Sequence, residues 1–174
     1  MSVQKSDEST PAESYLFNEA KCTLDSDTGA GSILLSSTSG SPTVEIKFKS
    51  LVSTSAQYQC QQASDNTTKG NLGMKYDKCG IQIQVPVSSS SVTNPTTNTY
   101  STYRSDDGIF TFTYDQSCTV SISSATLSAS GEANIVGSIA KCGGLVETHH
   151  QGSFRNPIDD TTPRVNLSGD FKCQ

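Results

Sequence analysis

The stretch TVEIKFK at Thr43–Lys49 decides the fold, because its apolar and charged side chains alternate strictly. One face of an extended chain then carries Val44, Ile46 and Phe48. The other face carries Glu45, Lys47 and Lys49. A period of two predicts a β-strand with one face on a core and the other in water. On the wet face we expect Glu45 to form a surface ion pair with its lysine neighbours.

The same period recurs in other short stretches of the chain. The clearest of them are Cys79–Val85, Ile109–Tyr114, Val120–Ser123 and Val165–Phe171. Glycine-containing turn sequences separate these runs, as expected for strands joined by hairpins. Strands with one wet face are typical of antiparallel sheets. We therefore predict an all-β fold of two packed antiparallel sheets with about eight to ten strands, a β-sandwich, with a flattened barrel as the alternative.

Six cysteines, an even number, are spread over the sequence: Cys22, Cys60, Cys79, Cys118, Cys142 and Cys173. No two of them have the CxxC spacing that structural zinc sites and redox dithiols use. Most fall on the apolar face of a predicted strand, where Cys118 accompanies Val120 and Cys173 accompanies Phe171. This set predicts three buried disulfides and an oxidising compartment. The sequence leaves the pairing of the cysteines open.

The composition predicts a core with few apolar side chains and excludes several classes of protein. Only 33% of the residues are apolar, while Ser and Thr fill more than a quarter of the positions. No apolar run approaches the roughly 18 residues that a membrane-spanning helix needs. The net charge of -5 and the pI of about 4.9 argue against a nucleic-acid partner, because the phosphate backbone would be repelled.

The beginning of the chain reads as a tether ahead of the domain. Residues 1–14 are polar and contain Pro11, so we expect a flexible segment, with one β domain over residues 15–174. The first residues lack the apolar core of a signal peptide, so we expect the mature form of a secreted protein, whose unprocessed form could carry a lipid anchor. Ala12–Cys22 is the one candidate for a helix, and it reads equally well as a lead-in to the first strand.

Catalytic motifs are missing from the sequence, so we predict no enzyme, no cofactor and no metal. GxSxG, GxxxxGK, GxGxxG and HExxH do not occur. His149 and His150 are the only histidines, in a stretch read as a polar loop over Thr148–Thr162. They could serve a hydrolase triad, or bind a metal with Asp159 and Asp160, but a solvated loop is the simpler interpretation.

Asp25 and Asp27 resemble the start of a calcium loop, where carboxylates at alternate positions converge on the ion. Gly29 and Ser36 stand where further acidic ligands belong. We therefore expect a tight turn after the first strand instead of a calcium site.

The strongest candidate for binding is the group Tyr100, Tyr103 and Arg104, at the end of a hydroxyl-rich loop over Ser88–Thr102. Tyrosine and arginine anchor binding surfaces because each offers a large area with a polar tip. The alternative is that one tyrosine packs on the sheet and the other covers a strand edge.

The sequence is compatible with three functions. The first is a non-enzymatic extracellular, periplasmic or cell-surface protein, such as a surface lipoprotein ectodomain, an adhesin or an assembly subunit, that binds a protein or glycan. The second is a glycan- or lipid-binding module, which needs a concave apolar or aromatic pocket. The third is a hydrolase that uses His149 or His150.

Overall fold

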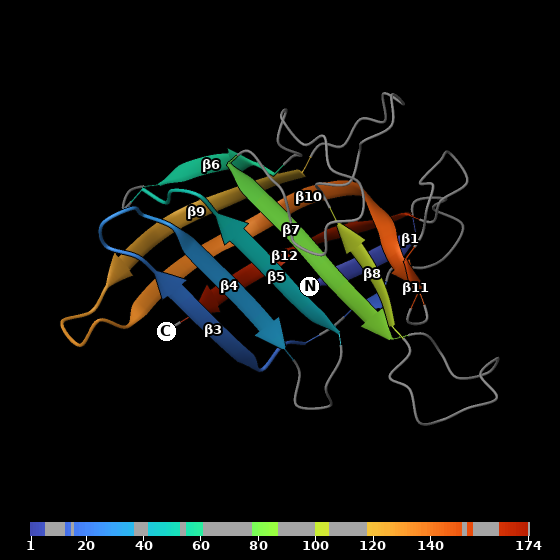
Figure 1. The fold of residues 1–174 in the computed structure, drawn as a ribbon, viewed down its shortest axis with the longest axis horizontal. Coiled ribbons are helices and arrows are strands. Elements are labelled where there is room, and N and C mark those ends of the chain that lie inside the picture. The colour runs from blue at the N-terminus through green and yellow to red at the C-terminus, as the bar shows by residue number, and fades with distance from the viewer. Residues whose placement is uncertain are drawn as a thin grey trace.

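The computed structural model shows a chain whose regular structure, in the part described, is all β-strand (Figure 1). The described residues are 1–5, 13–14, 16–36, 42–52, 55–60, 78–86, 100–104, 118–150, 153–154 and 164–173. They form antiparallel ladders folded into two packed layers, which confirms the predicted all-β fold.

The layer nearer the viewer in Figure 1 is built from strands that each pair antiparallel with the next. These strands are β3 (Glu19–Leu24), β4 (Gly31–Ser36), β5 (Thr43–Phe48), β7 (Cys79–Pro86) and β8 (Tyr100–Arg104). In the register Val44 lies opposite Leu35 on one side and Ile83 on the other. Since opposed residues share a face, this row of apolar side chains lines the inner side of the layer.

The second layer lies behind the first (Figure 1). It contains β6 (Ala56–Gln59), β9 (Cys118–Leu127), β10 (Ala133–His150), β12 (Arg164–Cys173), β1 (Ser2–Lys5) and β2 (Glu13–Ser14). The short strand β11 (Ser153–Phe154) pairs with the end of β10. The outer face of this layer is mostly hydroxyl and charged, in keeping with the alternation in the sequence.

Strand β10 joins the two layers. Its first part pairs with β9 and β12, and its last part, Val146–His150, pairs with β8. Register shifts occur on either side of Cys142, and bulges of this kind bend and twist a strand. The bend carries β10 from the back layer into the front one, so one continuous sheet folds over along this strand to form both layers.

Gly144 marks the second of these bulges. Its φ of 68° lies in the left-handed region, which glycine adopts without a steric penalty. The Gly144 N–H donates to Asn166 Oδ1 at 3.0 Å, and its carbonyl accepts from Arg164 Nη1 at 3.3 Å. Two side chains of β12 therefore satisfy the backbone groups that the bulge removes from the ladder.

The core lies between the layers and consists of the inward residues of both. Its largest fully buried side chains include Phe48, Ile33, Ile46, Ile81, Ile83, Ile122, Ile135, Ile139, Leu145 and Leu167. The rings of Phe48 in β5 and Tyr58 in β6 meet edge to face across the layers, with centroids 5.1 Å apart. The Tyr58 hydroxyl accepts the Val52 N–H at 2.9 Å, so the polar tip of the buried ring is satisfied.

All six cysteines form disulfides, as the sequence predicts. Cys118–Cys142 links directly opposed residues of β9 and β10. Cys60–Cys79 connects the residue after β6 in the back layer to the start of β7 in the front layer. Cys22–Cys173 connects β3 in the front layer to β12 in the back layer, 151 residues further along the chain. Two of the three disulfides therefore fasten one layer to the other.

The helical interpretation of Ala12–Cys22 is wrong, because this stretch contains strand β2 and the start of strand β3 instead. Glu13–Ser14 is β2, and β3 begins at Glu19. Pairing with β4 gives β3 its inter-strand hydrogen bonds, whereas an uncapped helix of this length is only marginally stable by itself. Flexibility of residues 1–14 stays a prediction, as does the boundary at residue 15. Within that segment the structure describes β1, which pairs with β12, and β2.

Two stretches predicted as loops contain strands. β8 begins at Tyr100, inside the stretch read as the Ser88–Thr102 loop, and β10 runs on to His150, inside the Thr148–Thr162 stretch. The described residues also hold twelve strands, more than the sequence predicts. The additional strands are short or polar, and pairing with long neighbours forms them without an apolar alternation of their own.

Candidate functional site

The predicted binding residues Tyr100, Tyr103 and Arg104 lie on β8, between β7 and β10. Tyr103 takes the register position opposite Ile83 and Glu147, both of which are buried. The strand is paired on both sides, so its backbone is not available for a further strand. Whether these three residues bind a partner stays a prediction.

The two histidines lie at the end of β10 and not in a loop. His149 pairs with Thr102 and Phe154, and His150 pairs with Ser101 and Ser153. Asp159 and Asp160, the partners considered for a metal, lie outside the described residues. Within the described part of the chain, no group of three His, Cys, Asp or Glu side chains is placed to hold a metal ion.

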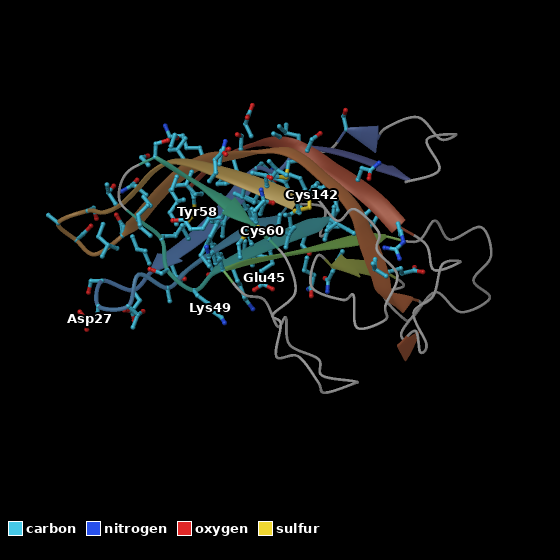
Figure 2. All side chains as sticks on the ribbon, turned by 90° about the horizontal axis from the view of Figure 1, so that it is seen from above. Asp27, Glu45, Lys49, Tyr58, Cys60 and Cys142 are labelled. Carbon is cyan, nitrogen blue, oxygen red and sulfur yellow. A yellow bond between two sulfur atoms is a disulfide. The ribbon has the colours of Figure 1, made fainter. Side chains whose placement is uncertain are left out.

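The Asp25 sequence forms a hairpin turn between β3 and β4, as predicted. Asp25 Oδ1 accepts the backbone N–H of Thr28 at 2.8 Å and that of Asp27 at 3.0 Å. These hydrogen bonds lower the pKa of the Asp25 carboxyl below its ordinary value, and the one from the Thr28 backbone has the largest effect. Asp27 points away from the domain (Figure 2). The carboxylate of Asp25 thus serves the turn itself.

Two acidic residues behave in opposite ways. Glu45 Oε1 forms the predicted surface ion pair with Lys47 Nζ at 2.9 Å, and Glu45 points outward from β5 (Figure 2). Glu147 is 1% exposed, although no sequence pattern predicts a buried side chain at this position. It follows the buried Leu145 and Val146, where the bulges in β10 disturb the alternation that otherwise tells inner from outer positions.

The feature best suited to binding is a groove of about 510 Å³ on the back layer, which we call the serine groove. Its lining comes from β9, β10, β12 and the residue before β6. The lining residues are Ser55, Ser121, Ile122, Ser123, Val136, Gly137, Ser138, Asp170, Phe171 and Lys172. Four serines, one aspartate and one lysine therefore line the groove together with apolar residues.

The register explains how residues far apart in sequence meet in the serine groove. Ser138 lies opposite Ser121 in β9 and opposite Asp170 in β12. These three positions form a polar row across the outer side of the layer. A bulge in β9 adds Ser123, whose hydroxyl donates to the Val136 carbonyl at 3.1 Å. The bulge interrupts the flat ladder beside Gly137, where the groove lies.

Comparison with known proteins gives no relative on which to base a function. No protein-family model, no curated protein and no solved structure matches this chain.

Proposed function

We propose that this chain is a non-enzymatic secreted or cell-envelope protein that acts by binding, and that the serine groove is its contact surface. The groove is the observation that carries the proposal. It is open, it combines hydrogen-bonding groups of both charges with an apolar floor, and it rests on paired strands, which hold a site rigidly.

Three disulfides indicate that the chain folds in an oxidising environment. We propose an extracellular, periplasmic or cell-surface location on this basis. No helix in the described part of the chain is long and apolar enough to cross a membrane. A surface lipoprotein ectodomain, an adhesin and an assembly subunit all fit such a location, with the lipid anchor of the first as a further proposal.

A glycan-binding module is the second candidate, and the lining of the serine groove favours it. Sugars present hydroxyl groups around a ring whose C–H faces are apolar. Ser121, Ser138 and Asp170 offer donors and acceptors in one row, and Val136 and Phe171 offer apolar surface beside them. Phe171 is 5% exposed, so it supplies the base of the groove and not a wide stacking platform.

The experiment is a binding screen on an array of defined oligosaccharides with wild type and two groove variants. Ser138→Leu places an apolar side chain in the polar row, and Asp170→Asn removes its charge. We expect each variant to weaken a bound oligosaccharide about tenfold or more, because a buried polar group of the ligand loses its partner.

Ser32→Leu is the matched control, because Ser32 lies on β4 in the other layer and pairs with the Thr23 hydroxyl there. It should bind like wild type. If wild type binds no oligosaccharide, the glycan candidate fails. If a ligand is bound equally by wild type and both groove variants, the serine groove is not the contact surface.

A further inference from the structure

The front layer ends at β3, which pairs with β4 on one side only among the described residues (Figure 1). An edge of this kind offers backbone donors and acceptors to another strand. The Cys22–Cys173 disulfide fixes β3 to the back layer, so the edge is held in an extended conformation before any partner arrives.

The β3–β4 turn fixes which backbone groups of β3 face outward. The Asp25 N–H donates to the Ala30 carbonyl at 2.8 Å, so Asp25 directs its N–H toward β4. Backbone direction alternates along a strand. Ala20, Cys22 and Leu24 therefore present their N–H and C=O groups to the open edge, while Glu19, Lys21 and Thr23 use theirs in the ladder with β4.

The charged side chains of β3 complement those of a second β3 strand in antiparallel orientation. Glu19 and Lys21 are both exposed, two residues apart on the outer face, with Ala20 between them. If a second β3 pairs antiparallel about Ala20, Glu19 of each copy lies opposite Lys21 of the other. This pairing creates two symmetry-related contacts between opposite charges.

Other centres for the pairing are less favourable. A pairing about Lys21 sets two lysines opposite each other, and one about Glu19 sets two glutamates opposite each other. A pairing about Cys22 places Glu19 opposite Asp25. A pairing about Thr23 runs the ladder into the Asp25 turn, whose carboxylate already accepts two backbone N–H groups. Only the centre at Ala20 joins opposite charges within the strand.

We propose that this edge binds a second copy of the chain, with the two β3 strands antiparallel about Ala20. Leu16 supports this register, because it is 86% exposed and would lie opposite the half-buried Leu24 of the second copy. The dimer thus covers an exposed leucine at each end and extends the front layer across both molecules. The serine groove lies on the other layer and remains open.

Sedimentation velocity of the oxidised protein over a range of concentrations tests the proposal. Wild type should dimerise reversibly, and more weakly at high ionic strength, because exposed ion pairs are screened. Glu19→Lys and Lys21→Glu each bring two pairs of like charges together, so each should weaken dimerisation about tenfold or more. The double variant Glu19→Lys, Lys21→Glu should regain dimerisation to within about threefold of wild type, because it restores opposite charges.

Ala20→Pro is an independent variant, because its missing N–H faces the open edge and not β4. Proline is accepted on an edge strand in this position, so the variant should fold with a near-native Tm and remain monomeric. Glu132→Lys is the matched control: it makes the same change in charge in the turn after β9, and should dimerise like wild type.

Three results would overturn the proposal. A wild-type protein that stays monomeric up to about 1 mM has no such interface. A folded Ala20→Pro variant that still dimerises uses another surface. A charge-swapped variant that stays as weak as the single variants, with an unchanged Tm, shows that Glu19 and Lys21 do not face each other. None of these results depends on whether the serine groove binds a ligand.

Discussion

Asp25 illustrates how one side chain can hold a connection between two strands. Its carboxylate accepts two backbone N–H groups in the β3–β4 turn, and Gly29 completes the turn with a φ of 72°. Asp25→Ala removes both hydrogen bonds, so we expect Tm to fall by a few degrees. Asp27→Ala is the control and should change Tm less, because the Asp27 carboxylate accepts only the Ser26 hydroxyl, at 3.3 Å, among the residues that the structure describes. Thermal unfolding monitored by circular dichroism compares the two.

The stabilising effect of Asp25 should depend on pH. Its pKa in the folded chain lies below its ordinary value, so ionised Asp25 favours the folded state. This contribution is complete above the unfolded pKa of about 3.9 and is lost as the pH falls through the folded pKa. The difference in Tm between wild type and Asp25→Asn should therefore shrink below about pH 4. A difference that persists unchanged into strong acid would contradict the assigned role of the carboxylate.

Tyr103 and Tyr100 take different register positions on β8, so single substitutions can distinguish their roles. Tyr103 lies opposite buried residues of both neighbouring strands, and opposed residues share a face of the sheet, so we expect Tyr103→Ala to lower Tm by about 10 °C. Tyr100 is the first residue of the strand, opposite Pro86, and Tyr100→Ala should cost less. Thermal melts and retention on immobilised ligand test both variants. A Tyr103→Ala protein with native Tm and lost binding would favour the contact role instead.

Single residues were predictable from sequence where the alternation is regular. Val44, Ile46 and Phe48 are buried as their spacing predicts, and all six cysteines are paired. Glu147 was not predictable, since its burial depends on bulges that shift the alternation. The serine groove was not predictable from the sequence either. Its four serines belong to two strands, β9 and β10, and to the residue before β6, and only the register brings them together.

At the scale of elements, β10 determines how the two layers connect. A strand of 18 residues is long enough to pair with β9 first and with β8 later. The sequence Gly143-Gly144 hints at an irregularity, but the length of the strand follows from its partners. The alternation in the sequence predicts β5 and β7, but it predicts loops at β8 and at the end of β10. These strands form by pairing with distant segments, which local sequence patterns do not show.

Two glycines of β10 should respond differently to alanine. Gly144 has a positive φ, and a Cβ there would lie in open space. Gly144→Ala therefore introduces backbone strain without a steric clash and should lower the free energy of unfolding by about 1 kcal/mol. Gly137 has an ordinary φ, but a Cβ there would run into the Ser121 carbonyl and lie 2.7 Å from Phe171 Cζ. Gly137→Ala should therefore cost about 3 kcal/mol through overpacking. Urea unfolding measures both, and equal costs would mean that β10 adjusts at Gly137.

For the whole molecule, the disulfides differ in how much chain they enclose. Cys22–Cys173 spans 151 residues, against 24 for Cys118–Cys142 and 19 for Cys60–Cys79. Loop-closure entropy then predicts a loss of about 5 kcal/mol for the double variant Cys22→Ser, Cys173→Ser and about 3 kcal/mol for either of the other pairs. Denaturant unfolding of the three double variants checks this order. Thiol titration of the unreduced, unfolded wild type should find no free thiol. A smaller loss for the long loop than for the short ones would show that native contacts outweigh chain entropy.

The same long disulfide determines how the molecule carries mechanical load. Tension between residues 1 and 174 first meets the β1–β12 ladder and then reaches the covalent bond between Cys22 and Cys173. Once β1 has separated from β12, the backbone of the 151-residue span enclosed by that bond carries no tension, and its roughly 500 Å of contour length cannot be extended until the bond is reduced. A cell-surface domain pulled from both ends would lengthen only by its short terminal segments, while the sandwich with its serine groove remained intact under load.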